Sequence, residues 1–255
     1  MDKDIKYTKD FYEEEYNITR YGDAIDKVGL WNSEKIIFQK YISKNDKILD
    51  IGCGAGRTTI NLYKEGYKNI IGLDLSTKLI DYANNYVDKN NLEIKFINGD
   101  ATKLEFEDNL FDIVIFSYNG MQCIPGKHNR DNVLKEVYRV LKPGGLYIFT
   151  AHNRDDSGSF SSFWEEEKLR WENGTQDKSL DMFGDKYSLD KTGQPCFVHF
   201  SNIEEMQEFI HQENFEILDY KKNTDISEET EATKEFAGNT VFWIVKKLKG
   251  WYYEW

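Results

Sequence analysis

A glycine-rich turn between a short apolar strand and a predicted helix constrains this chain more than any other feature. Residues 47–59 read KILDIGCGAGRTT, with glycine at positions 52, 54 and 56. Glycine at alternate positions lets the backbone turn tightly where a side chain would collide with a ligand. The free N–H groups at the start of the next helix face that turn. The stretch therefore predicts an α/β fold with a nucleotide-type binding site.

The spacing of these glycines argues against a dinucleotide site. The pattern G-x-G-x-x-G would need glycine at the position of Arg57, and the third glycine is instead Gly56. Asp50 precedes the turn, where a carboxylate would repel a diphosphate but would suit an ammonium or sulfonium group. The string resembles motif I of the class I S-adenosylmethionine-dependent methyltransferases, (D/E)-x-G-x-G-x-G, because Asp50, Gly52, Gly54 and Gly56 fill its defined positions.

The second predicted strand, Ile70–Asp74, ends in an acid about 20 residues after the glycine turn, where a carboxylate can bind both ribose hydroxyls of an adenosine. Asp74 also suits the start of a helix, because Ser76 is expected to cap the helix that follows. Both interpretations can hold together.

The third predicted strand, residues 94–97, is followed by Asp100 and Ala101. The resemblance implies that the Asp100 carboxylate and the Ala101 backbone hold the adenine. Turn chemistry alone would also explain Asp100, since it lies in an Asn-Gly-Asp cluster.

A fourth strand, Phe111–Phe116, is followed by Ser117, Tyr118 and Asn119. Ligands of open α/β sheets bind outside the carboxyl ends of the strands, so these polar residues should converge on one site. Apolar spacing predicts a helix over 132–141, stopped by residues 142–145 before a fifth strand, 146–150. These motifs extend the resemblance over roughly residues 45 to 151.

The expected fold is α/β, a Rossmann-like seven-stranded mixed sheet that is mostly parallel, with an antiparallel last strand and helices on both faces. Strands six and seven are predicted at 215–220 and 240–245. The expected organisation is an N-terminal helical cap (1–42), a core (43–151 and 201–247), a substrate-side insertion or lid (152–200) and an aromatic tail (248–255).

The N-terminal region should be helical and is rich in aromatic residues. The resemblance implies that such a helix folds over the cofactor, and Arg20 with Tyr21 is the pair expected at the cofactor's carboxylate, which a guanidinium matches bidentately. Alternatively, these aromatic side chains cover the open edge of the sheet.

The insertion carries Phe160, Phe163, Trp164 and Trp171 on one predicted helical face, which suits either a buried helix or a lid that touches the substrate. Residues 177–195 show no period and are expected to be irregular. Residues 201–204 are expected to form a capping box, and residues 226–235 are the nearest thing to a disordered stretch.

The cofactor implied by the resemblance is S-adenosyl-L-methionine, with S-adenosyl-L-homocysteine as product. The residues expected to contact it are Arg20, Tyr21, Asp50, Gly52, Cys53, Gly54, Gly56, Arg57, Asp74, Leu75, Asp100, Ala101, Ser117 and Tyr118.

Methyl transfer from a sulfonium needs chiefly in-line placement of the acceptor. His152 is the candidate general base, although a histidine at a strand end can simply bond to local backbone. Asn119 and Tyr118 are candidates for binding the acceptor, His199 is a weaker candidate base, and His128 and His211 are expected on the surface. No metal-ligand spacing is visible in the sequence.

Composition favours a cytoplasmic enzyme with a small substrate. The net charge is −12, which argues against a nucleic-acid partner because such binding neutralises phosphates with Lys and Arg. The lysines near 221 and 246–249 suit solvated strand ends. Three cysteines far apart suggest free thiols in a reducing compartment, and no membrane span or signal peptide is visible.

The sequence therefore predicts an S-adenosylmethionine-dependent methyltransferase that acts on a small molecule, as a monomer or homodimer. A tRNA methyltransferase of the wobble-uridine type is an alternative, and so is a non-catalytic partner subunit that binds the cofactor. A nicotinamide dehydrogenase is disfavoured by Arg57 and Asp50. The aromatic tail, Gly250–Trp255, is expected to pack on the body or on a partner chain.

Overall fold

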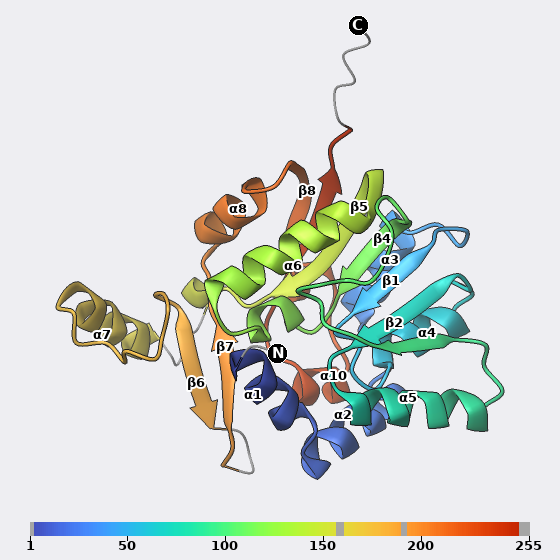
Figure 1. Cartoon of the computed structure of the whole chain (residues 1–255), viewed down its shortest axis with the longest axis horizontal. Helices are drawn as coiled ribbons and strands as arrows, with labels where there is room; N and C mark the ends of the chain where they lie inside the picture. Colours follow the sequence, from blue (N-terminus) through green and yellow to red (C-terminus); the bar gives the residue numbers. More distant parts are fainter. Residues whose placement is uncertain (1–2, 157–160, 190–192, 250–255) are drawn as a thin grey trace, which may run out of the picture.

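Seven strands form one sheet in the order β3-β2-β1-β4-β5-β9-β8 (Figure 1). The computed structural model describes residues 3–156, 161–189 and 193–249. The strands are β1 (Ile48–Ile51), β2 (Ile70–Asp74), β3 (Lys95–Asn98), β4 (Phe111–Phe116), β5 (Leu141–Ala151), β8 (Phe215–Lys222) and β9 (Val241–Lys247). β1 to β5 pair in parallel, and β9 is antiparallel to both neighbours. The predicted mixed sheet with an antiparallel last strand is confirmed.

Alternating apolar side chains bury both faces of this sheet. Leu49 and Val114 pack on one face with helices α6 (Lys127–Val140) and α8 (Ile203–His211), whereas Ile48 and Ile113 pack on the other with α3 (Asn32–Tyr41) and α4 (Arg57–Lys64). Successive side chains of a strand point to opposite faces, so a nearly continuous apolar run is required where helices cover both.

The helices are α1 (Lys3–Tyr12), α2 (Glu15–Lys27), α3 (Asn32–Tyr41), α4 (Arg57–Lys64), α5 (Thr77–Lys89), α6 (Lys127–Val140), α7 (Ser161–Glu172), α8 (Ile203–His211), α9 (Asn223–Ile226) and α10 (Glu231–Phe236), with short 3-10 helices η1 (Gly120–Cys123) and η2 (Arg154–Asp156). Three helices therefore occupy the N-terminal region predicted to be helical. No described helix combines the length and apolar character of a membrane span.

The junction between α6 and β5 differs from the prediction. The helix begins at Lys127 rather than 132, and the strand begins directly after it at Leu141 rather than 146. The register shifts from Phe111↔Leu141 to Ile113↔Leu146, so residues 142–145 bulge out of the ladder. Gly144 takes a φ of +86° there, which glycine adopts easily.

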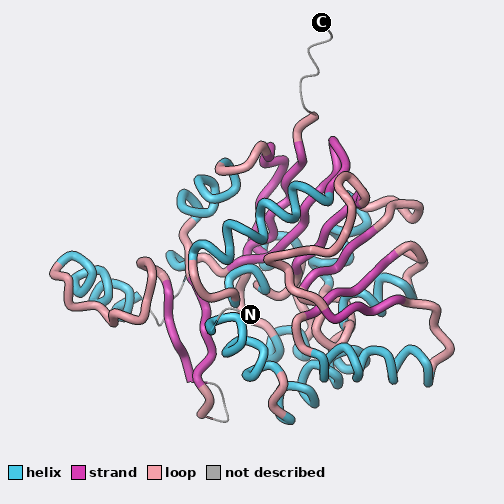
Figure 2. The backbone as a smooth tube through the Cα atoms, viewed as in Figure 1, coloured by secondary structure: helices cyan, strands magenta, loops and turns pink. Residues whose placement is uncertain are grey.

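The insertion contains a regular hairpin that the sequence did not indicate. Strands β6 (Asp185–Leu189) and β7 (Pro195–His199) pair antiparallel, so the expectation of an irregular segment over 177–195 is wrong there. Figure 2 shows this hairpin beside the main sheet, with α7 beyond it. Within α7, Trp164 is buried and Leu169 is exposed. Phe160, Thr192 and Gly250–Trp255 lie outside the described residues.

Two other local predictions need correction. The capping box at the start of α8 joins Asn202 and Glu205, one residue later than expected, because the Asn202 side chain accepts the Glu205 N–H. The acidic stretch expected to be least ordered forms α10, which Thr230 caps by accepting the Thr233 N–H.

Candidate functional site

A cavity lies at the carboxyl ends of β1, β2 and β4, and α1, η1 and α10 close its other side. It encloses about 1090 Å³ of empty space, its open mouth included. It lies where the strand order reverses, the usual ligand position in open α/β sheets. Twelve of the fourteen residues expected to contact the cofactor line it: Tyr21, Asp50, Gly52, Cys53, Gly54, Ala101, Arg57, Asp74, Leu75, Asp100, Ser117 and Tyr118. Arg20 and Gly56 do not.

The three glycines of the loop serve different purposes, although all have positive φ. A β-carbon added at Gly52 would lie 2.3 Å from the Phe116 ring, and one at Gly56 would lie 2.7 Å from Phe96. A β-carbon at Gly54 would meet no protein atom within 4 Å. Two glycines thus permit close packing, and Gly54 keeps the space above the loop open.

Asp74 ties the glycine loop to the start of α5. Its carboxylate accepts the Gly54 N–H at 2.7 Å and the Ser76 N–H at 2.8 Å. Ser76 in turn caps α5 by accepting the Leu79 N–H. Burial raises the pKa of the Asp74 carboxyl despite these hydrogen bonds. The carboxylate therefore takes part in local structure and also lines the cavity.

Asp50 is a buried carboxylate beneath the loop. It is 1% exposed, and the Thr59 hydroxyl donates to it at 2.6 Å. Burial raises the pKa of Asp50 to about 7 against the effects of Thr59 and Arg57. A carboxyl so poorly solvated gains much from a cationic ligand.

The Arg57 guanidinium is engaged by the protein itself. It donates to both carboxylate oxygens of Glu34 at 2.7 Å and to the Gly29 carbonyl. Both side chains are buried, with Glu34 fully enclosed. Arg57 therefore joins α4 to α3. It borders the cavity, but its two donors to Glu34 are already occupied.

Asp100 and Ala101 lie at the end of β3, on the cavity wall. The Asp100 carboxylate accepts the backbone N–H and the hydroxyl of Thr102, at 2.8 and 2.7 Å. Asp100 therefore forms the turn predicted from the sequence and also lines the cavity.

Arg20 lies behind the wall that Tyr118 and Phe236 form. Its guanidinium donates to the Tyr118 hydroxyl at 2.8 Å and to the Phe236 carbonyl at 3.0 Å. The Tyr118 and Phe236 rings stack at 4.7 Å. Sequence reasoning missed Phe236, which lines the cavity from α10. The cap residue Thr230 was the signal that could have identified this helix.

His152 does not line this cavity. It lies on a second cavity, of about 900 Å³, between the end of β5 and the insertion. Its Nε2 lies 3.1 Å from the Asn119 amide nitrogen, and its Nδ1 lies 3.3 Å from the Asn239 carbonyl. Because an amide nitrogen only donates, Nε2 accepts and Nδ1 carries the proton. The prediction that His152 faces the methyl group is therefore not supported, and the interpretation as a strand-end histidine bonded to backbone fits.

Asn119 likewise does not line the first cavity. Its side chain bridges His152 and the Thr240 hydroxyl, and its N–H donates to Thr150. His199 is buried against Asp185 in the insertion, at 2.8 Å, whereas His128 and His211 are exposed as expected. Within the described residues, no group of three His, Cys, Asp or Glu side chains could hold a metal ion.

The cavity has two chemically different ends. All three of its carboxylates, Asp50, Asp74 and Asp100, lie on the side of the glycine loop and the strand ends. The other end, formed by α1, η1, the segment before α6 and α10, is mainly apolar and aromatic, and its lining includes Ile5, Tyr12, Cys123, Ile124, Pro125 and Phe236 beside the polar Thr8 and Lys9. Burial raises the pKa of Tyr12 and of the Cys123 thiol, so both stay protonated near neutral pH.

Comparison with known proteins places residues 48–145 in a methyltransferase domain family. A demethylmenaquinone methyltransferase of Lactobacillus johnsonii is 41% identical over 116 residues, which cover 44% of this chain and 46% of that protein. A sterol 24-C-methyltransferase of Kluyveromyces lactis is 32% identical over 146 residues, 54% of this chain and 38% of that protein. The chain thus spans less than half the length of these two curated relatives.

The fold has a similar counterpart among solved structures. A crystal structure of a methyltransferase from Methanosarcina mazei, described as dependent on S-adenosylmethionine, superposes with a TM-score of 0.67. The two chains are 22% identical, and the match covers 86% of this chain and 99% of the other. This similarity shows the fold.

Proposed function

Because this chain belongs to the class I S-adenosylmethionine-dependent methyltransferase family, we propose that it transfers the methyl group of S-adenosylmethionine to a small-molecule acceptor. The observation that carries the proposal is the cavity itself. Carboxylates from the ends of β1 and β2, and from just after β3, converge on one side of it, and an apolar pocket faces them.

The residues present fit this cofactor. The open space above Gly54 would be filled by a β-carbon and can instead receive a ligand. The buried Asp50 carboxylate suits the positive charge of the methionine end, Asp74 suits the ribose hydroxyls, and Asp100 with the Ala101 backbone suits the adenine. When bound, the cofactor supplies an electrophilic methyl group on a sulfonium.

The protein's contribution to the transfer is placement of the acceptor and exclusion of water. Positioning of this kind can supply on the order of 7–11 kcal/mol of the barrier. The apolar end, with Tyr12, Cys123 and Phe236, would receive the acceptor. None of the described residues that line this end is a histidine or a carboxylate. We therefore expect an acceptor whose nucleophilic atom is reactive without a general base at this wall.

The substrate class follows from the same surface. An apolar and aromatic pocket favours a largely apolar small molecule. The names of the two relatives, a demethylmenaquinone and a sterol methyltransferase, also refer to small molecules.

Calorimetric titration with S-adenosylmethionine and S-adenosylhomocysteine tests the cofactor assignment. We expect micromolar binding to the wild type, and binding that is lost or greatly weakened in Asp74→Ala. Asp88→Ala removes an exposed acid from the same helix region and should bind like the wild type. No binding of either compound to the wild type would contradict the proposal.

Release of S-adenosylhomocysteine in the presence of apolar small molecules and labelled methyl donor then tests transfer. Tight cofactor binding without turnover on any acceptor would instead favour a non-catalytic binding subunit.

A further inference from the structure

The short segment between η1 and α6 forms part of the apolar end of the cavity, and two main-chain carbonyls of this segment are held from α6. The Asn129 amide donates to the Pro125 carbonyl at 3.0 Å, and the Arg130 guanidinium donates to the Ile124 carbonyl at 2.9 Å. Ile124 and Pro125 line the cavity, whereas Arg130 does not. Arg130 therefore acts on the cavity through the backbone of its wall.

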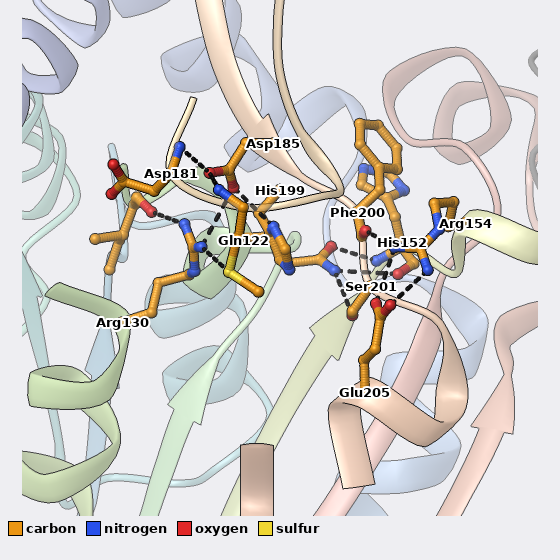
Figure 3. A network of polar contacts seen from close by, with 12 residues as sticks. Gln122, Arg130, His152, Arg154, Asp181, Asp185, His199, Phe200, Ser201 and Glu205 are labelled. Carbon is orange, nitrogen blue, oxygen red and sulfur yellow. Dashed lines mark hydrogen bonds and ion pairs between the residues drawn. The ribbon is translucent and has the colours of Figure 1, made fainter. Parts of the chain in front are cut away.

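The same guanidinium reaches into the insertion. Arg130 is 4% exposed, and its Nη2 lies 3.2 Å from a carboxylate oxygen of Asp185, the first residue of β6. Nη2 also lies 3.1 Å from the Met182 sulfur. Figure 3 shows the Arg130 side chain with its guanidinium directed toward Asp185.

Asp185 is held in place from several sides. One oxygen accepts from His199 at 2.8 Å as well as from Arg130, and the other accepts the N–H groups of Asp181 and Met182 (Figure 3). Burial would raise the pKa of Asp185, but the His199 hydrogen bond and the Arg130 charge outweigh it and lower the pKa. The carboxylate is thus a fixed anchor for Arg130 at neutral pH.

We propose that Arg130 is a positioning residue that couples the β6–β7 hairpin to the acceptor end of the cavity, with Asp185 as its anchor in the insertion. The inference rests on the proposed function only in calling this end the acceptor side. No described residue of the hairpin lines the cofactor cavity. Through Arg130, however, the hairpin holds the backbone of Ile124, which lines it.

Cys123 provides a direct measure of this wall. Cys123 lines the cavity and directly precedes Ile124, whose carbonyl Arg130 holds. Cys53 lines the same cavity from the glycine loop, so it is an internal control. Cys53 and Cys123 both carry thiols, and mass spectrometry of iodoacetamide-treated protein can follow each one separately.

The expected result is selective. In Arg130→Gln, alkylation of Cys123 should rise by about tenfold or more, because a hydrogen bond from a charged donor no longer opposes opening of the wall. Cys53 should react at the wild-type rate. Asp185→Asn should also raise the alkylation rate of Cys123, but by a smaller factor. Arg130→Lys should protect Cys123 from alkylation better than Arg130→Gln does.

Arg154 supplies the matched control. It is a buried arginine that donates to the Phe200 carbonyl and pairs with Glu205, so it also fastens the insertion but touches no wall of the cofactor cavity (Figure 3). Arg154→Gln should leave Cys123 protected. If the alkylation rates of Cys123 and Cys53 rise equally in both arginine variants, the whole fold has been loosened and the proposal is overturned. An unchanged alkylation rate of Cys123 in Arg130→Gln would also overturn it.

Binding of S-adenosylhomocysteine separates this inference from the proposed function. Arg130→Gln should bind it within about twofold of the wild type, since Arg130 lies behind the opposite end of the cavity. A large loss would place Arg130 at the cofactor and contradict a role at the acceptor wall. Absence of binding to the wild type would refute the proposed function, while the cysteine rates would still decide the coupling.

Discussion

Replacing Asp50 with asparagine should stabilise the protein at alkaline pH while weakening cofactor binding. The carboxylate is buried beneath the glycine loop, with a pKa raised to about 7 by desolvation. Asparagine has nearly the same shape and keeps an oxygen that can accept the Thr59 hydroxyl. The substitution thus removes the buried charge and little else.

The sign follows from proton binding. Between an unfolded pKa of 3.8 and a folded pKa of about 7, the folded state holds more protons at Asp50, so wild-type stability falls as pH rises through this window. A pKa difference of about three lowers the free energy of unfolding by about 4 kcal/mol, since each pKa unit corresponds to about 1.4 kcal/mol. Asp50→Asn should escape this loss, with a melting temperature higher than wild type by roughly 10 °C at pH 8.

Urea unfolding of both proteins from pH 4 to 8.5 measures the effect. We expect nearly equal free energies of unfolding at pH 4 and a growing advantage for Asp50→Asn toward pH 8. Asp112→Asn is a control of opposite sign: although burial would raise the pKa of Asp112, hydrogen bonds from Lys142 and the Lys47 N–H lower it. An Asp50→Asn difference that stays constant across the whole range would refute the reasoning.

The remaining predictions concern binding and the buried charges. Wild-type affinity for S-adenosylmethionine should rise between pH 6 and 8 as Asp50 ionises, and calorimetry in buffers of different ionisation enthalpy should show proton release; a flat profile would argue against contact with the cation. Gly54→Ala should cost about 1–2 kcal/mol of stability because of its positive φ, and it should abolish binding. Gly52→Ala carries the same strain and should cost about 1–3 kcal/mol more, because its β-carbon meets the Phe116 ring. Equal melting temperatures of the two variants would contradict this prediction. Glu34→Gln should destabilise by about 3–5 kcal/mol because it leaves Arg57 buried without its counter-ion, and a change below about 1 kcal/mol in denaturant unfolding would show that water reaches the pair.

Most of the sheet could be predicted because its signals are local. β2 and β4 match the predicted ranges in full, since each is a short apolar run bounded by turn residues. The hairpin of β6 and β7 could not be predicted in this way. Its strands carry mixed polar and apolar residues, and the contacts of Asp185 with Arg130 and His199 that hold it join distant parts of the chain.

The same distinction explains the errors at the site. Asp50 and Asp74 lie at the ends of β1 and β2, Asp100 lies just after β3, and the topology of a parallel sheet brings strand ends together. His152 also follows a strand end, but its ring lies against Phe200 and faces the second cavity. Being at the correct edge of the sheet did not determine which cavity the side chain would enter.

The two ends of the cofactor cavity therefore have different origins. The polar end depends on a glycine loop and on strand ends, each of which is formed by a short local stretch of the chain. The apolar end depends on α1, η1 and α10, and on Arg130, which reaches from α6 to Asp185 in the insertion. A change in the insertion can thus reshape the apolar wall through one guanidinium while Gly54 and Asp74 remain undisturbed. Under the proposed function, substitutions in the insertion would alter the acceptor pocket and leave the cofactor end of the cavity unchanged.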